Sequence, residues 1–270
     1  MNIALEPMSF DVDGGDRGAL TLRGTRYLPE GFGADGGHPV AVLMHGFGGN
    51  RIDFSGFIVQ VGRTLAEHGV VAVAYDRAGH GESDGDFFDT TIAGDVDDAL
   101  QVIAAVRRMP GVDPNDLHLV GLSFGAVQST YLAPLLDVPP RSLTLCSTAS
   151  SYADEIRGGH LQGQPLDSVA ATGYFDFMGV AMGPALIDEA KATDVYAKAQ
   201  GYDGPVLFVH GTEDFIPVDY VERYRDVYGE RMETMIVQGG NHGFGNVAHR
   251  RAIMPRIAQF VSGHALHAAA

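Results

Sequence analysis

"DLHLVGLSFGAVQSTYLAPLL", residues 116–136, decides the fold of this chain of 270 residues. The apolar run of a buried strand leads into a Gly-x-Ser-x-Gly pentapeptide at 121–125, and an apolar helix pattern follows directly. A serine at such a junction sits in a tight turn that needs small neighbours, and Gly121 and Gly125 supply them. The stretch therefore predicts an α/β fold with Ser123 at the carboxyl edge of a sheet.

Strand patterns alternate with helix patterns along most of the chain. This alternation predicts a mostly parallel sheet flanked by helices on both faces, with the first two strands antiparallel at one edge. The last helix contains Pro255 and is expected to be interrupted there. The expected strands cover residues 3–12, 18–28, 38–46, 70–76, 116–121, 141–146, 205–211 and 232–240. The expected helices cover residues 54–69, 90–110, 126–136, 218–229 and 248–264.

The segment 148–200 breaks this rhythm. It is rich in glycine, methionine and aromatic residues and shows no clear strand pattern. We interpret it as a small lid inserted over the carboxyl edge of the sheet, where open α/β sheets bind ligands. The predicted organisation is an α/β core made of residues 1–147 and 201–270, with the lid between its two parts.

A second Gly-x-Ser-x-Gly pentapeptide, "GESDG" at 81–85, competes with the first. Such a pattern is the signature of a nucleophilic serine only where a strand precedes it and a helix follows. Ser83 lies in "DRAGHGESDGDFFDTT", whose glycines and aspartates predict a loop. The context therefore favours Ser123 as the nucleophile.

A nucleophilic serine needs a histidine base and an acid that orients it, expected in the order serine, acid, histidine. The loop "HGTEDFIP" carries Glu213 and Asp214 after a buried strand, and "GGNHGF" places His242 after the next strand. We favour Asp214 because it lies at the turn. Asp219 is a weaker candidate because it is expected to open a helix.

Two backbone N–H groups would complete an oxyanion hole. One should belong to Phe124, the residue after the nucleophile, and the other to Phe47 in the loop "HGFGGN" at 45–50. The alternative for that loop is an ordinary glycine-rich turn. Three other histidines lie in strand-end loops and are expected to tie backbone there, namely His45, His80 and His210.

Composition limits the partners of this chain. Hydrophobic residues make up 45% of it, and the formal net charge is −16, which repels phosphate backbones and excludes nucleic acid as an expected partner. The dense acidic stretch at 94–100 is interpreted as the solvated first turns of a helix. No spacing typical of metal ligands is present, so neither a metal nor another cofactor is expected.

Location and assembly are only loosely constrained. We expect no membrane partner, because no apolar run approaches the roughly 20 residues that span a bilayer, and no secretory signal is visible at the start. A single cysteine, Cys146, allows no internal disulfide and is expected to be buried. The cytoplasm is therefore the default compartment. A homodimer is possible, and the sequence does not decide the oligomeric state.

The motifs "HGFGGN", "DRAGHGESDG", "GLSFGA", "HGTEDFIP" and "GGNHGF" together resemble the α/β-hydrolase superfamily. Within it the chain is most similar to bacterial cinnamoyl esterases, which act on feruloyl and chlorogenate esters, although Phe124 stands where those enzymes often carry glutamine. The resemblance implies that lid residues contact the phenolic ring of the substrate. Asp154 and Tyr174, or Phe175 beside it, are the best matches.

The expected function is hydrolysis of a small-molecule carboxylic ester through an acyl-enzyme on Ser123, with hydroxycinnamate esters as substrates. A general carboxylesterase for short acyl chains and a serine aminopeptidase of the prolyl-oligopeptidase type are the enzymatic alternatives. A ligand-binding receptor or scaffold on the same fold is the alternative without catalysis.

Overall fold

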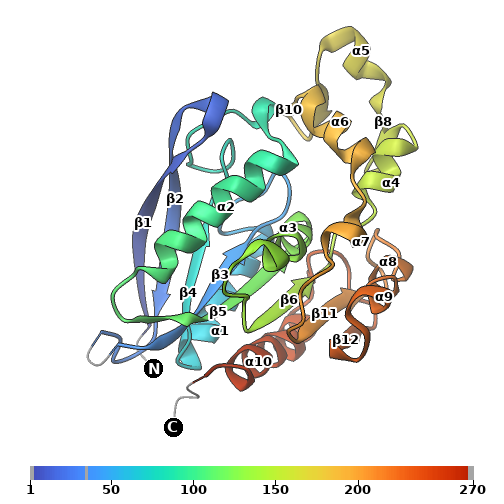
Figure 1. The fold of residues 1–270 in the computed structure, drawn as a ribbon. Coiled ribbons are helices and arrows are strands. Elements are labelled where there is room, and N and C mark those ends of the chain that lie inside the picture. Colours follow the sequence, from blue (N-terminus) through green and yellow to red (C-terminus); the bar gives the residue numbers. More distant parts are fainter. Residues whose placement is uncertain (1–2, 34–35, 267–270) are drawn as a thin grey trace.

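The computed structural model describes residues 3–33 and 36–266 (Figure 1). Its centre is an eight-stranded sheet in the order β1-β2-β4-β3-β5-β6-β11-β12. β1 and β2 form an antiparallel edge, and the six strands from β4 to β12 in that order run parallel. The predicted α/β-hydrolase fold is confirmed. The strands are β1 (Ala4–Asp13), β2 (Ala19–Leu28), β3 (His38–Met44), β4 (Val71–Tyr75), β5 (Val112–Leu122), β6 (Ser142–Cys146), β11 (Val206–Gly211) and β12 (Met232–Val237).

Both faces of the sheet are apolar, as β3 illustrates. Val40 and Val42 belong to the hydrophobic core on one face, while Ala41 and Leu43 belong to the core on the other. All four are completely buried. A strand covered on both faces needs no polar side, which explains why its sequence reads as one continuous apolar run.

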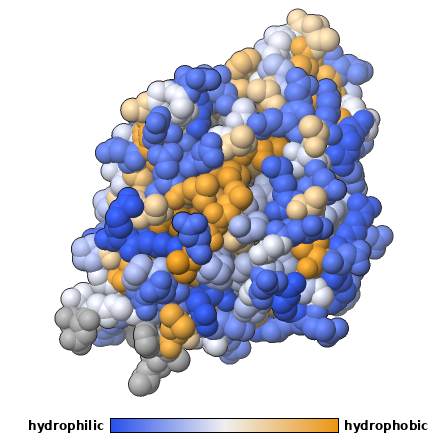
Figure 2. Space-filling model, viewed as in Figure 1, coloured by the Kyte–Doolittle hydropathy of each residue, from blue (hydrophilic) through white to orange (hydrophobic). Residues whose placement is uncertain are grey.

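Helices cover each face of the sheet (Figure 1). Those of one face pack with the core that contains Val40, and those of the other with the core that contains Ala41. The first layer is α2 (Ile92–Arg107) and α3 (Phe124–Leu132); the second is α1 (Phe57–Glu67) and α10 (Val247–Gly263). Figure 2 shows the face that carries α2 and α3: hydrophilic side chains cover most of it, and hydrophobic ones gather near its middle.

Two helix predictions near the end of the chain need correction. The interruption expected at Pro255 does not occur, since α10 runs through it. Proline removes one N–H donor but keeps a helical φ, and the buried neighbours Ile253 and Ile257 hold both sides of that turn against the sheet. The helix expected over 218–229 is instead divided into α8 (Asp219–Glu222) and α9 (Arg225–Tyr228).

The segment 148–200 does contain strands, contrary to the expectation of none. It forms two short antiparallel pairs, β7 with β8 and β9 with β10, among short helices. Strands of two or three residues are too short for a periodic pattern to reveal them. The division into core and lid stays a prediction, and residues 1, 2, 34, 35 and 267–270 of that core lie outside the described residues. The elements are α4 (Tyr152–Arg157), β7 (His160–Leu161), β8 (Gln164–Pro165), α5 (Val169–Thr172), β9 (Phe175–Phe177), β10 (Val180–Met182), α6 (Pro184–Ala192) and α7 (Val195–Lys198).

The acidic start of α2 is solvated only in part, which corrects a further prediction: Asp97 is exposed, but the other two acids are buried. Asp95 and Asp98 are each 2% exposed. Asp95 pairs with Arg77 at 3.0 Å, and Asp98 pairs with Arg17 at 2.8 Å. Buried carboxylates require such partners, and arginines distant in sequence supply them. Within the described ranges, no helix is both long and apolar enough to cross a bilayer.

Candidate active site

Ser123 occupies a strained turn between β5 and α3. Its φ is +56° and its ψ is −118°, a backbone conformation that residues other than glycine rarely adopt. Its flanking glycines have no room for a side chain: a Cβ on Gly121 would lie 2.4 Å from the Cα of Ala126, and one on Gly125 would lie 2.3 Å from the carbonyl oxygen of Met44. The predicted junction therefore forms as the pentapeptide requires.

The structure brings Ser123, Asp214 and His242 together. His242 Nε2 lies 2.8 Å from Ser123 Oγ, and its Nδ1 lies 2.8 and 3.0 Å from the two carboxylate oxygens of Asp214. Asp214 follows β11 and His242 follows β12, so neighbouring parallel strands deliver both to one sheet edge. Because the carboxylate can only accept, Nδ1 carries a proton and Nε2 is free to accept the Ser123 hydroxyl proton.

The surroundings keep the Asp214 carboxylate ionised. Burial alone would raise its pKa, but the hydrogen bond and charge of His242, with the Ile216 N–H at 3.0 Å, outweigh burial and hold that pKa below its usual range. The Phe215 ring packs on the His242 imidazole at a centroid distance of 4.3 Å. Asp214 is thus suited to fix the imidazole tautomer and to stabilise an imidazolium.

The two predicted oxyanion donors lie beside Ser123. Phe124 is the first residue of α3, and the loop of Phe47 passes close enough that a Cβ on Gly46 would lie 3.3 Å from Ser123 Cβ. In the described part of the chain, neither the Phe47 nor the Phe124 N–H donates a hydrogen bond to another protein atom. Both amides are therefore free to bind an oxygen of a ligand.

The competing serine and acids occupy other positions. Ser83 Oγ donates to the Asp76 carbonyl at 2.6 Å and accepts from the Arg23 N–H at 2.8 Å, so it ties a loop to β2. Glu213 lies on the rim of the triad cavity, and Asp219 opens α8. His242 hydrogen-bonds to neither of these acids.

The three other predicted structural histidines each contact a backbone carbonyl. His45 lies 2.8 Å from the oxygen of Gly46, and His80 lies 2.9 Å from that of Ala78. His210 lies 2.9 Å from the Ile216 oxygen, and its other nitrogen lies 3.9 Å from the Asp214 carboxylate. Among the described residues, no cluster of metal-ligating side chains is found.

A cavity of about 760 Å³ opens above the triad, a volume typical of small-molecule sites. Apolar and aromatic side chains dominate its wall, and a few polar ones interrupt it. The lining side chains that come from outside the triad and the glycines are Phe47, Asn50, Asp53, Phe54, Leu122, Gln162, Phe177, Met178, Val180, Glu213, Phe215 and Asn241. A neighbouring cavity of about 800 Å³ between α1 and α10 shares Phe54 and Asn241 but contains no triad residue.

The predicted lid contacts Asp154, Tyr174 and Phe175 do not line this cavity. The Asp154 carboxylate bonds to the Tyr220 hydroxyl at 2.9 Å and to Arg223 at 3.2 Å, facing another cavity. Phe175 is 4% exposed within the core, and Tyr174 lies exposed at the surface. Ion pairs therefore hold Asp154 away from the triad cavity, packing in the core does the same for Phe175, and Tyr174 lies at the surface outside it.

Gln162, Phe177, Met178 and Val180 line the cavity in their place. The Phe177 ring packs against that of Phe47 at 4.9 Å, and Met178 is 87% exposed on the rim. Phe177, Met178 and Val180 lie in the run "YFDFMGV" at 174–180, which is aromatic and apolar apart from Asp176 and Gly179, and Gln162 lies outside it. Such a run does not reveal which side chains face the cavity, so sequence reasoning missed them.

Similarity to known proteins agrees with this geometry. The family model described as "Alpha/beta hydrolase family" matches residues 41–269. The chain belongs to the alpha/beta hydrolase family. This family membership accounts for the sheet and its flanking helices, with the strand–turn–helix junction at Ser123. No curated protein matches the chain in sequence.

Solved structures of other alpha/beta hydrolases share its fold. Est1E from Butyrivibrio proteoclasticus, solved with ferulic acid bound, is 24% identical over 95% of this chain and 98% of its own, with a TM-score of 0.84. Mouse alpha/beta hydrolase domain-containing protein 10 is 17% identical over 95% and 99% of the two chains, with a TM-score of 0.73. Acylaminoacyl peptidase from Pyrococcus horikoshii is 19% identical over 96% of this chain and 41% of its own, with a TM-score of 0.71.

Proposed function

We propose that this alpha/beta hydrolase cleaves carboxylic esters through an acyl-enzyme on Ser123. The observation that carries the proposal is the continuous hydrogen-bond chain from Asp214 through His242 to Ser123 Oγ. Two unoccupied amides beside that hydroxyl support it. A scaffold that only bound ligands would have no use for this combination.

In the proposed reaction, His242 Nε2 takes the hydroxyl proton as Ser123 Oγ attacks the ester carbonyl carbon. The carbonyl oxygen becomes an oxyanion and accepts hydrogen bonds from the Phe47 and Phe124 amides. As the carbon–oxygen bond to the alcohol breaks, His242 returns the proton to the departing oxygen. Water, activated by the same imidazole, then releases the acid from Ser123.

We further propose that the acyl group is a hydroxycinnamate. The cavity wall offers aromatic faces from Phe47 and Phe177 on the lid side and from Phe54 and Phe215 on the rim, which suit a flat conjugated acid. Gln162 is a polar side chain on the lid side of that wall and could bind a ring hydroxyl. Est1E, similar in fold, was solved with ferulic acid.

The test combines covalent labelling with a substrate panel. A fluorophosphonate should label the wild-type protein and the Ser83→Ala variant at one site and leave Ser123→Ala unlabelled. On methyl caffeate, methyl ferulate, methyl cinnamate and methyl butyrate, which share one leaving group, kcat/KM should be highest for the two hydroxylated aromatic esters. A site that hydrogen-bonds a hydroxyl discriminates against the analogue that lacks it.

Each alternative gives its own result. Preference for the butyrate would make the protein a general carboxylesterase, and turnover of aminoacyl anilides alone would make it an aminopeptidase. Labelling of Ser123 without turnover of any ester would contradict ester hydrolysis and, with it, the hydroxycinnamate assignment. An unlabelled wild-type protein would contradict nucleophilic catalysis altogether.

A further inference from the structure

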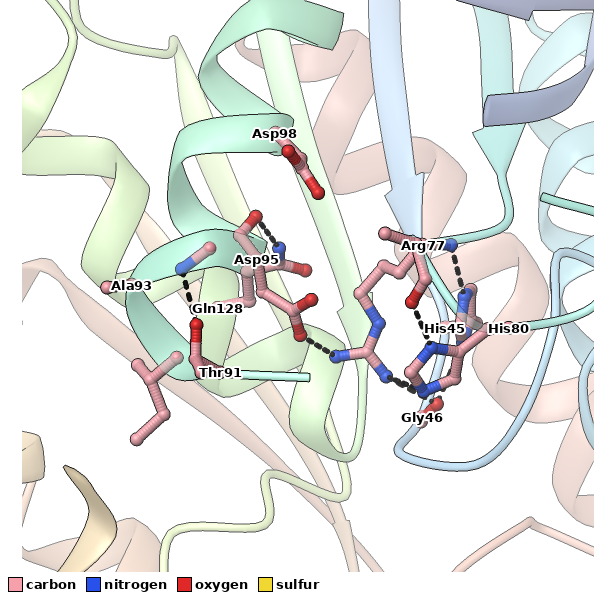
Figure 3. Close-up of polar contacts among 12 residues, drawn as sticks. His45, Gly46, Arg77, His80, Thr91, Ala93, Asp95, Asp98 and Gln128 are labelled. Carbon is pink, nitrogen blue, oxygen red and sulfur yellow. Dashed lines mark hydrogen bonds and ion pairs between the residues drawn. The ribbon is translucent and has the colours of Figure 1, made fainter. Parts of the chain in front are cut away.

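A buried arginine beneath the candidate oxyanion hole has no part in the mechanism described so far. Arg77 follows β4 and is 2% exposed. Its Nη1 donates to the Asp95 carboxylate at 3.0 Å, and its Nη2 donates to the carbonyl oxygen of Gly46 at 2.9 Å. Figure 3 shows the guanidinium between the α2 carboxylate on one side and the Gly46 carbonyl and two histidines on the other. Burying this charge is costly, so its position calls for a physical reason.

The Gly46 carbonyl belongs to the peptide unit whose N–H is that of Phe47. A peptide is planar and almost always trans, so the direction of its C=O fixes the direction of its N–H. Three donors converge on this carbonyl: Arg77 Nη2, His45 Nδ1 at 2.8 Å and the Gly49 N–H at 3.2 Å. Hydrogen bonds to the oxygen also polarise the peptide and make its N–H a stronger donor.

The neighbouring histidines are built to support this arrangement as neutral groups. His45 Nε2 accepts from the Arg77 backbone N–H at 3.1 Å, so its Nδ1 must carry the proton that is donated to Gly46. Burial and the Arg77 charge lower the pKa of His45 well below its usual value and that of His80 to about 3. His45 therefore remains a fixed donor of one tautomer.

The same guanidinium also contacts both residues that supply the candidate oxyanion donors. Its Cζ lies 5.2 Å from the ring centroid of Phe124 and 5.9 Å from that of Phe47. The two rings themselves meet edge to face at a centroid distance of 5.5 Å. Arg77 thus contacts the side chains of both donors and the carbonyl of one.

We infer that Arg77, held by Asp95, is a positioning residue that orients and polarises the Gly46–Phe47 peptide toward the developing oxyanion. This inference rests on the proposed function, because it concerns the transition state of the reaction at Ser123. A buried ion pair that only stabilised the fold would have no reason to end on this one carbonyl. The pair formed by Arg17 and Asp98 is such a structural pair. Its carboxylate lies on α2, as that of Asp95 does, and it provides the matched control.

The deciding variant is Arg77→Lys, which keeps the charge but cannot bond to Asp95 and Gly46 in the same fork geometry. With active sites counted by complete fluorophosphonate labelling, kcat on 4-nitrophenyl acetate should fall about 10- to 100-fold while KM changes by less than about threefold. Affinity for a trifluoromethyl ketone, which adds to Ser123 as a tetrahedral oxyanion, should weaken by the same factor. Asp95→Asn should likewise lower kcat and weaken ketone affinity. It replaces Arg77→Lys as the test variant if the lysine variant fails to fold.

Arg17→Lys should lower stability and leave kcat and ketone affinity within about twofold of wild type. The inference is overturned if Arg77→Lys and Asp95→Asn, where folded, behave as Arg17→Lys does, or if they raise KM while kcat stays unchanged. A wild-type protein that hydrolyses no ester would overturn the proposed function as well. An active wild type with normal kcat in Arg77→Lys would overturn only the role of Arg77.

Discussion

The two Gly-x-Ser-x-Gly pentapeptides share a pattern and differ in what surrounds them. In 81–85, the Ser83 hydroxyl donates to the backbone carbonyl of Asp76, just after β4, and accepts from the backbone N–H of Arg23 in β2. In 121–125, Ser123 faces an imidazole at 2.8 Å. The first hydroxyl therefore holds a loop in place, whereas the second is left available for chemistry.

Their first glycines make the same point through different neighbours. A Cβ on Gly81 would lie 2.3 Å from the Asp76 carboxylate, and one on Gly121 would lie 2.4 Å from the backbone of α3. Both glycines are required. Gly81 leaves room for the Asp76 carboxylate that bonds to the surrounding loop, and Gly121 lets α3 start directly after β5. The comparison teaches that the pentapeptide encodes close packing, and that the elements ending nearby determine whether its serine meets an imidazole.

The largest expected effect separates the two serines. Ser123→Ala should lower kcat on a nitrophenyl ester by about 10⁴-fold or more, because the acyl-enzyme cannot form. Ser83→Ala should change kcat by less than about threefold and cost about 1 kcal/mol of stability, the value of a hydrogen bond. Steady-state kinetics and urea unfolding measure the two quantities. A folded but inactive Ser83 variant would reverse the assignment.

The acids near each pentapeptide should differ in the same sense. Asp76 is completely buried and accepts from the Glu82 N–H and from the backbone and side chain of Arg51. Asp76→Ala should lower the free energy of unfolding by about 3 kcal/mol or more, since it leaves these donors unpaired. Asp214→Asn should instead lower kcat by about 10³- to 10⁴-fold, with a clearly smaller loss in the free energy of unfolding than Asp76→Ala causes. Equal stability losses in both variants would break the comparison.

Salt should distinguish two carboxylates whose pKa values are both lowered. Arg51 lowers the pKa of the exposed Glu82 by a hydrogen bond and its charge, while His242 lowers that of Asp214 within the core against the effect of burial. Each lowered pKa adds stability that is present above the ordinary carboxyl range and lost as pH falls through the folded pKa. NMR titration should find the Glu82 shift reduced in about 1 M salt, where screening is strong, and the Asp214 shift retained. An Asp214 shift that disappears in salt would contradict its burial.

The smallest effect concerns the reactivity of Cys146, a buried thiol that packs beneath the second pentapeptide. Cys146 is fully buried, its pKa is raised by burial to about 12, and its carbonyl accepts from the Ser123 N–H at 2.9 Å. A thiol reagent such as Ellman's should therefore react with no thiol in the native protein and with one in urea. Rapid labelling without denaturant would mean that the turn at Ser123 opens readily, contrary to the rigid turn described above.

Sequence patterns were sufficient where a residue lies at the end of a regular element. Ser123 and Asp214 follow buried apolar strands, and His242 follows the edge strand β12. Parallel strands necessarily end at one sheet edge, so the three side chains could be predicted to meet. The same logic identified the loop of Phe47. The prediction failed at Pro255, because packing of its helix against the sheet outweighed a local preference.

Tertiary structure alone decided which side chains meet outside such elements. Asp95 reads as a surface acid in sequence, yet it pairs with Arg77 beneath the Phe47 loop. In the segment 148–200, Asp154 turns to Arg223 while Phe177 faces the triad. The sequence by itself determined the main sheet, most of its flanking helices and the order of Ser123, Asp214 and His242, because periodic burial and strand ends are local signals. The wall of the cavity and the support of its amides depend on charge pairing and packing between distant residues, which no local pattern records.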